Sequence, residues 1–130
     1  MILGFDPGRD KCGVAIAYPD GTPQWYQVVN RADVPPVLTQ LQQDYAITQI
    51  VMGNQTTAQQ WAAEVKPLFP ADIPFNFVNE RNSSLEARDR YWQMFPPQGL
   101  ARLIPQGMRL PPRPVDDIVA ILLIERYLNP

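Results

Sequence analysis

Residues 1–30, MILGFDPGRD KCGVAIAYPD GTPQWYQVVN, decide the fold, because they contain three short apolar runs separated by turns. The runs are Met1–Asp6, Gly13–Tyr18 and Trp25–Val29, and a Pro-Gly or Pro-Asp-Gly turn sequence follows each of the first two. Connections this short favour antiparallel neighbours, so we expect three strands in a meander.

Beyond residue 30 the pattern alternates between helix and strand. We expect helices starting at Asp33, over Thr56–Leu68, from Ser83 to about Met94 and over Val115–Leu128, with strands over Ile47–Met52 and Phe75–Val78. Asp33 is expected to cap the first helix, Thr56 or Thr57 the second, and the Ser83-Ser84-Leu85-Glu86 capping box the third. Residues 96–114 contain six prolines and two glycines, which predicts a loop with at most a short helix near Leu100–Ile104.

Three antiparallel strands followed by two β-α-β crossovers predict a mixed five-stranded sheet of order 3-2-1-4-5. Strand 2 is antiparallel to its neighbours, and helices cover both faces. This is the ribonuclease-H-like arrangement of an α/β protein. The alternative is a flavodoxin-like fold, which begins with β-α-β rather than with a meander. A length of 130 residues predicts a single domain over residues 1–130.

The chain has no histidine and one cysteine, which excludes several classes of chemistry. Ser-His-Asp and Cys-His catalysis and His-ligated zinc sites are ruled out, and Cys12 has no partner for an internal disulfide. The longest apolar run, Ile118–Ile124, is far shorter than the ~20 residues that span a bilayer. We therefore expect a cytoplasmic protein without membrane contact, whose working groups, if it is an enzyme, are carboxylates.

Charge is uneven along the chain, although the formal net charge is only −2. Residues 1–80 carry four basic and eight acidic side chains, whereas residues 81–115 carry six arginines against two acids. A net-acidic protein is not typical of nucleic-acid binders, which usually have a basic surface. The arginine-rich segment has two interpretations: it binds a polyanion, or it is an ordinary solvent-exposed loop.

Candidate catalytic carboxylates follow two predicted strands and begin the last helix. Asp6 ends the first strand, Glu80 follows the fifth, and Asp116 and Asp117 open the helix. Each has an ordinary structural explanation, as a turn residue, a rim charge or a favourable helix N-terminal charge. The predicted topology nevertheless brings all three positions to one end of the sheet. Adjacent helical residues point roughly 100° apart, so at most one of Asp116 and Asp117 faces that site well.

Clustered carboxylates repel each other unless a cation neutralises them, and oxygen ligands select Mg²⁺ or Mn²⁺. Two such ions roughly 4 Å apart activate water and stabilise the leaving oxygen in phosphodiester hydrolysis. This chemistry requires no histidine, so the composition of the chain and the predicted placement of its carboxylates both favour it.

Three segments in register resemble one family across almost the whole chain. MILGFDPG at 1–8 with Gly13-Val14-Ala15 is similar to the opening of RuvC and YqgF/RuvX proteins, whose first strand ends in a catalytic Asp. VNERNSSLEA at 78–87 resembles the YqgF segment built around Asp-Glu-Arg and a Ser/Thr pair, and VDDIVA at 115–120 resembles its terminal helix.

The resemblance implies a metal-dependent nuclease of the RuvC-like ribonuclease H superfamily, with Asp6, Glu80 and Asp116 as catalytic metal ligands. RuvC helices carry an Asp-Ala-Leu-Ala pattern that aligns with Asp117 instead, so both aspartates stay candidate ligands. Family members are linked to resolution of four-way DNA junctions and to trimming of ribosomal RNA precursors. RuvC relatives act as symmetric dimers, although nothing in this sequence defines a dimer face.

The sequence departs from the YqgF pattern at several positions. Asn79 replaces an Asp, Gly53-Asn54-Gln55-Thr56-Thr57 replaces a Gly-x-Pro loop, and Asp10-Lys11-Cys12 replaces a basic-Ile pair. Asn54, Gln55 and Thr56 are able to hydrogen-bond phosphates or water, or to form a polar turn. Candidate nucleic-acid contacts are Lys11, Asn54, Arg81, Arg88, Arg109 and Arg113.

Two other functions remain open. The first is a non-catalytic nucleic-acid-binding or scaffold module on the same fold, which the acidic balance, Asn79 and the altered loop after Gly53 favour. The second is a sugar- or ATP-binding relative of the actin-like group, which shares the fold and an Asp-x-Gly opening. Those proteins need two lobes and a second phosphate-binding loop, whereas this chain supplies one lobe and no P-loop.

Overall fold

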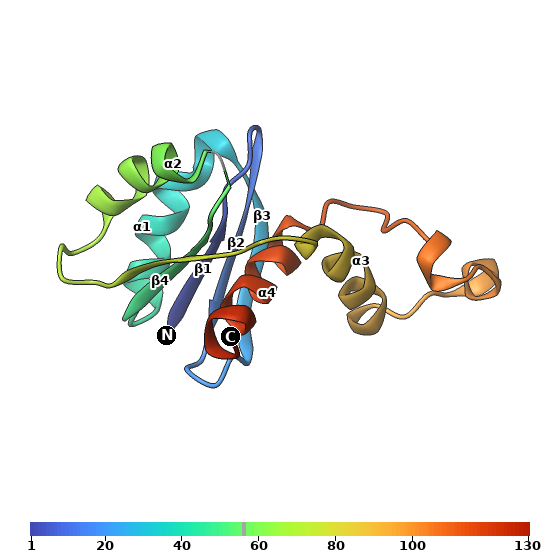
Figure 1. Ribbon diagram of the computed structural model, residues 1–130. Coiled ribbons are helices and arrows are strands. Elements are labelled where there is room, and N and C mark those ends of the chain that lie inside the picture. Colours follow the sequence, from blue (N-terminus) through green and yellow to red (C-terminus); the bar gives the residue numbers. More distant parts are fainter. Residues whose placement is uncertain (56) are drawn as a thin grey trace.

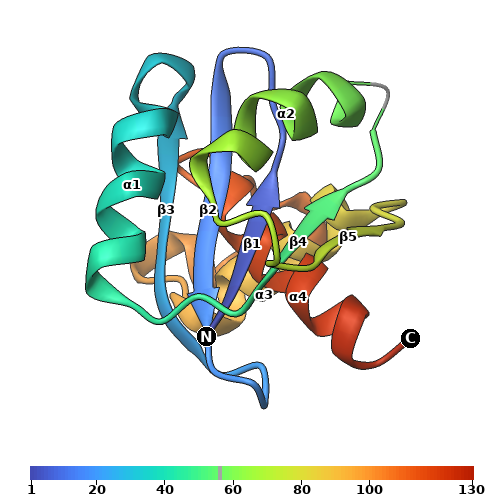
Figure 2. The ribbon, with the colours of Figure 1, turned by 90° about the vertical axis from the view of Figure 1, so that its left-hand side faces the viewer.

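The computed structural model describes residues 1–55 and 57–130 and contains the predicted mixed sheet of five strands (Figures 1 and 2). The strands are β1 (Ile2–Asp6), β2 (Lys11–Ala17), β3 (Pro23–Asn30), β4 (Gln49–Gly53) and β5 (Phe75–Val78). Their order is β3-β2-β1-β4-β5, with β2 antiparallel to β1 and β3, and β4 and β5 parallel to β1. The predicted order and strand directions are confirmed.

Helices cover both faces of the sheet. They are α1 (Val34–Asp44), α2 (Ala58–Val65), α3 (Ser83–Met94) and α4 (Asp116–Leu128). Helices α1 and α2 lie on one face, and α4 lies on the other with α3 packed beside it (Figure 1). Short 3₁₀ turns occur at Arg31–Asp33, Lys66–Leu68, Gly99–Leu103 and Gln106–Met108.

The alternation of β1 sends its side chains to two different cores. Leu3 and Phe5 are buried in the layer that β1 shares with α1 and α2, whereas Ile2 is buried in the layer with α4. Gly4 also faces α4, since a Cβ built on it would lie 2.6 Å from the carbonyl oxygen of Ala120. Asp6 continues this second set, so the strand period of two directs the carboxylate toward α4.

Helix α4 approaches β2 most closely at Gly13, which pairs with Asp6 across the β1–β2 ladder. A Cβ at Gly13 would overlap the backbone carbonyl of Asp116, the first residue of α4. The missing side chain at Gly13 therefore lets the start of α4 dock against β2, beside the end of β1.

The helix starts differ from the predicted capping. Asn82, in the left-handed conformation with φ 62°, precedes α3, and Ser83 is a buried residue inside the helix. No side chain caps α3, so the predicted capping box is wrong, and the carboxylate of Glu86 pairs with Arg126 at 2.9 Å instead. Asp33 and Thr57 precede α1 and α2, but the side chain of neither accepts a capping hydrogen bond, and Thr56 lies outside the described residues.

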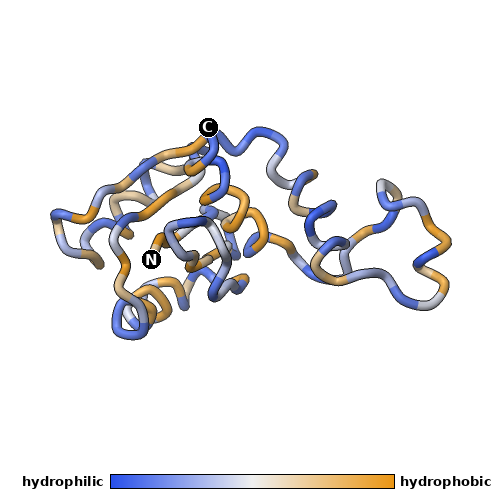
Figure 3. The backbone as a smooth tube through the Cα atoms, turned by 90° about the horizontal axis from the view of Figure 1, so that it is seen from below, coloured by the Kyte–Doolittle hydropathy of each residue, from blue (hydrophilic) through white to orange (hydrophobic). Residues whose placement is uncertain are grey.

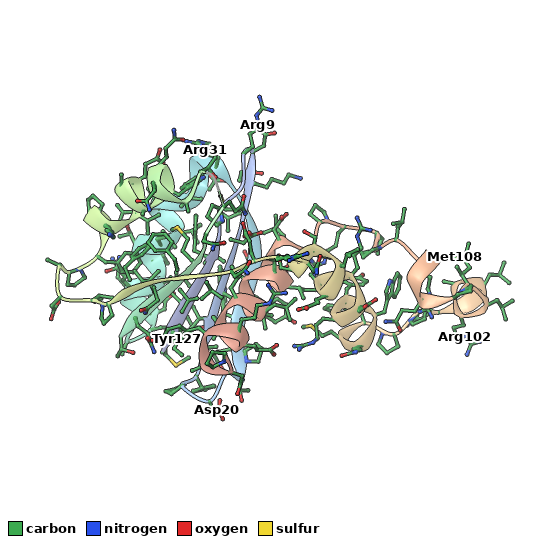
Figure 4. The ribbon with its side chains drawn as sticks, in the orientation of Figure 1. Arg9, Asp20, Arg31, Arg102, Met108 and Tyr127 are labelled. Atoms are coloured by element: carbon green, nitrogen blue, oxygen red, sulfur yellow. The ribbon has the colours of Figure 1, made fainter. Side chains whose placement is uncertain are left out.

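Residues 96–114 form an arm that leads from α3 to α4 and extends away from the sheet (Figures 1 and 4). Its predicted short helix is the 3₁₀ turn Gly99–Leu103. Four apolar side chains of the arm are largely exposed: Leu100 81%, Leu103 80%, Met108 75% and Leu110 73%. Hydrophobic and hydrophilic segments alternate along the arm (Figure 3), and none of the buried core residues lies in it.

Among residues 1–55 and 57–130, no helix has the length and apolar character needed to cross a membrane.

Candidate functional site

Three carboxylates from distant parts of the chain line one pocket. Asp6 ends β1, Glu80 lies two residues beyond β5, and Asp116 is the first residue of α4. The pocket is completed by Pro7, Gly8, Gln55, Ser83, Ser84 and Val119. Because β1, β4 and β5 are parallel, their carboxyl ends meet at one edge of the sheet, and α4 starts there. The structure thus brings together three of the four acids that the sequence singles out, and Asp117 is the exception.

Gln55 connects two of these carboxylates. Its side-chain Nε2 donates to Asp6 Oδ1 at 3.1 Å and to Glu80 Oε2 at 3.0 Å, and it lies 2.7 Å from the carbonyl oxygen of Pro7. Glu80 also reaches toward β4, where a Cβ on Gly53 would overlap its carboxylate. Gly53 therefore leaves room for Glu80 beside Gln55. The sequence identifies Gln55 only as a polar loop residue, and no local pattern signals its contact with two acids.

Burial and mutual repulsion favour the protonated forms of the pocket acids. Asp6 is 6% exposed, and burial, followed by the charges of Asp116 and Glu80, raises its pKa to about 8. Burial also raises the pKa of Glu80, although its hydrogen bond with Asp6 and the charge of Arg126 act in the opposite direction. The pKa of Asp116 is raised by burial and by Asp117, while Lys11 acts in the opposite direction. Ionising all three acids together is therefore unfavourable unless a cation neutralises them.

Asp117 belongs to a different environment from Asp116. It is 3% exposed, accepts a hydrogen bond from Arg113 Nη1 at 3.0 Å, and also accepts one from the backbone N–H of Ile118 at 2.9 Å. It lines a separate pocket with Lys11, Asn30 and Arg113. The geometry distinguishes the two candidates: Asp116 faces the pocket of Asp6 and Glu80, whereas Asp117 is held in an ion pair on another side of the helix.

The predicted Mg²⁺ or Mn²⁺ ligands fit a hard cation in chemistry, because carboxylate oxygens are the donors such ions select. Their present arrangement does not converge on one ion. Among residues 1–55 and 57–130, no three His, Cys, Asp or Glu side chains are close enough to hold a metal together. The amide of Gln55 lies between the carboxylates of Asp6 and Glu80 in this arrangement.

The candidate nucleic-acid contacts separate into two groups. Lys11, Asn54, Arg81 and Arg88 are exposed. Lys11 begins β2 close enough to affect Asp116, and Arg88 lies one turn beyond the pocket residue Ser84 on α3.

Arg109 and Arg113 make internal contacts instead. Arg109 donates to the carbonyl of Ile104 at 2.8 Å and lies 5.4 Å from the ring centroid of Trp92. Arg113, besides its pair with Asp117, lies 5.4 Å from the ring of Tyr91. Arg109 thus connects the arm to α3, and Arg113 connects the end of the arm to α3 and α4.

Arg126 is a residue near the site that the sequence does not single out. Its guanidinium donates to the backbone carbonyl of Asn79 at 2.8 Å and pairs with Glu86 at 2.9 Å. The side chain of Asn79 accepts a hydrogen bond from the backbone N–H of Arg81 at 2.9 Å. These contacts fix the turn that carries Glu80. An arginine near the end of a strongly apolar helix is the only sequence signal for this role.

No protein-family model and no curated protein sequence matches this chain.

Proposed function

We propose that this protein is a divalent-cation-dependent nuclease that hydrolyses phosphodiester bonds in structured nucleic acid, either branched DNA or precursor ribosomal RNA. The observation that carries the proposal is the convergence of Asp6, Glu80 and Asp116 in one pocket. They come from β1, from the segment after β5 and from α4, and burial raises the pKa of each, so a cation is needed to hold all three in their ionised forms. The resemblance of these same three segments to YqgF/RuvX proteins implies the same activity.

In this proposal Asp6, Glu80 and Asp116 hold Mg²⁺ or Mn²⁺, which would supply Lewis-acid activation of water and of a phosphoryl oxygen. The protein's own contribution is to fix the acids on rigid elements. Asp6 is fixed by the β1–β2 ladder, and Asp116 by the packing of α4 on Gly13. One buried and two half-buried carboxylates, without a cationic side chain among the pocket residues, are suited to a cation that neutralises them.

A nucleic-acid substrate is supported by the distribution of basic and polar groups near the pocket. Ser84 lines it, exposed Arg88 follows one helical turn later, and exposed Arg81 is adjacent in sequence to Glu80. Side chains of these types contact phosphate oxygens in protein–nucleic acid complexes. A cytoplasmic location fits the proposal, because the single cysteine, Cys12, is a buried free thiol.

A second candidate is a non-catalytic nucleic-acid-binding or scaffold module. The observation in its favour is that the amide of Gln55 hydrogen-bonds both Asp6 and Glu80. Asn79 points the same way, because it adds no negative charge beside Glu80.

Cleavage and binding assays on one substrate panel separate the two candidates. The panel contains a four-way DNA junction, a hairpin RNA and a precursor ribosomal RNA fragment, each incubated with Mg²⁺, Mn²⁺ or EDTA. The nuclease proposal predicts cation-dependent cleavage of at least one substrate. Binding without cleavage on every substrate would support the scaffold alternative and contradict the nuclease.

A further inference from the structure

The position of Gln55 has a consequence for how the pocket is loaded. One amide nitrogen lies within 3.1 Å of three oxygens, from Asp6, Pro7 and Glu80. An amide NH₂ has only two hydrogens, so three acceptors share two donors. The nitrogen thus occupies a point at which two carboxylates and a backbone carbonyl converge, which is the kind of oxygen set that hard cations select.

An amide nitrogen and a cation cannot use the same carboxylate oxygens from the same place. Hydrogen-bond donors and metal ions both seek the lone pairs of Asp6 Oδ1 and Glu80 Oε2, and Gln55 now holds these two atoms. A cation that binds between these two oxygens, at the position of the amide nitrogen, must therefore displace the amide.

We propose that Gln55 is the resident partner of the Asp6–Glu80 pair and competes with the divalent cation, so that the Gln55 side chain must swing out before the cation binds. The inference rests on the proposed function, because it concerns the cation site of that same pocket. It names Gln55 as the residue that sets the affinity of the pocket for the cation.

The surroundings of Gln55 permit this movement without unfolding. The residue is half-buried and lies in the connection between β4 and α2, next to the exposed Asn54. Its backbone is anchored, since its carbonyl oxygen accepts a hydrogen bond from Ala58 at 2.9 Å and Asn54 donates to Val78 at 3.0 Å. Rotation about the side-chain bonds of Gln55 is therefore sufficient, and the backbone keeps its place.

The opposite role for Gln55 makes the opposite prediction. If the amide rotates only to present its Oε1 atom to the cation, Gln55 is a ligand, and its removal weakens binding. If Gln55 competes, its removal strengthens binding. A competing group lowers the apparent affinity by the free energy of the contacts that must be broken, and one charge-assisted hydrogen bond corresponds to about a tenfold change.

The test is a calorimetric titration of Mn²⁺ into the wild type, Gln55→Met, Gln60→Met and Asp6→Asn. Methionine has nearly the length of glutamine and no amide donor, and Gln60 is an exposed residue of α2 that serves as the matched control. We expect a Kd for Gln55→Met at least about tenfold lower than that of the wild type. Gln60→Met should match the wild type, and Asp6→Asn should lose binding.

Thermal unfolding supplies a second measurement that does not depend on one variant. Gln55→Met and Gln55→Ala should both unfold at lower temperature than the wild type in EDTA, since the acid pair loses its donor. Mn²⁺ should then raise the Tm of both variants by more than it raises that of the wild type.

The outcomes separate the inference from the proposed function. An unchanged or higher Kd in Gln55→Met, with wild-type binding that Asp6→Asn abolishes, overturns the role of Gln55 and leaves the cation site standing. Failure of wild type and Gln55→Met alike to bind millimolar Mn²⁺ overturns both.

Discussion

Replacing Asp6 by Asn should stabilise the metal-free protein at neutral pH. The carboxyl of Asp6 is buried beside Asp116 and Glu80, which raises its pKa to about 8 from the model-peptide value of 3.8. The folded protein therefore keeps this proton at pH 7, whereas the unfolded chain releases it near pH 4. Because the folded state binds the additional proton, raising the pH through this range favours unfolding.

The size of the effect follows from the separation of the two pKa values. Each pKa unit corresponds to 1.36 kcal/mol. The contribution of Asp6 to the free energy of unfolding therefore falls by up to about 4 kcal/mol between pH 3.8 and pH 7. Asparagine does not ionise, and its side-chain oxygen still accepts a hydrogen bond from Gln55. We expect Asp6→Asn to unfold with a free energy about 2–4 kcal/mol above that of the wild type at pH 7, and about equal to it near pH 4.

Urea unfolding in EDTA at pH 4, 5, 6, 7 and 8 measures this difference. Asp72→Asn, at an exposed position in the connection before β5, is the matched control and should differ little from the wild type at any of these pH values. A stability difference between Asp6→Asn and the wild type that does not grow from pH 4 to pH 7 would refute the reasoning. So would a variant less stable than the wild type at pH 7.

Three further changes test how the site and the arm are built. Gly13→Ala places a Cβ against the backbone of Asp116, so it should lower the free energy of unfolding by about 2–4 kcal/mol and weaken Mn²⁺ binding, as urea unfolding and calorimetry would show. Arg113→Ala leaves the buried carboxylate of Asp117 without its partner, and an expected loss of about 1–3 kcal/mol is measured by a double-mutant cycle with Asp117→Asn. Leu103→Ser should change the free energy of unfolding by less than about 0.5 kcal/mol, because Leu103 is 80% exposed; a larger loss in urea would show that the arm packs on the domain.

The sheet could be predicted from the sequence because its signals are local. The Pro-Gly and Pro-Asp-Gly turns define the meander, and the apolar run over Ile47–Met52 overlaps β4, while the run over Phe75–Val78 coincides with β5. Once the strand order is known, the carboxyl ends of β1 and β5 must share an edge. The convergence of Asp6 and Glu80 therefore follows from topology rather than from any single motif.

The details that the sequence could not supply depend on three-dimensional packing. Asp116 and Asp117 are identical neighbours, and only the docking of α4 on Gly13 decides which one faces the pocket. Arg109 and Arg113 appear in the sequence as part of a basic loop, but their aromatic partners on α3 are decided by the path of the arm.

The capping box and Gln55 show the same limit. The Ser-Ser-Leu-Glu pattern marks the start of α3 correctly, yet Glu86 bonds Arg126, from a helix that follows much later in the chain. Gln55 contacts Asp6 and Glu80, which lie 49 and 25 positions away in the sequence, and no local pattern encodes these contacts.

The most direct test of the central claim is single-turnover cleavage of a labelled four-way DNA junction and a hairpin RNA in Mn²⁺. The wild type and Asp72→Asn should cleave at least one substrate at the same rate, and EDTA should stop both. Asp6→Asn, folded and more stable than the wild type, should be at least about a hundredfold slower on that substrate. Cleavage by Asp6→Asn at the wild-type rate would contradict the proposal that these carboxylates form a nuclease centre. So would a wild type that cleaves neither of these substrates nor a precursor ribosomal RNA fragment.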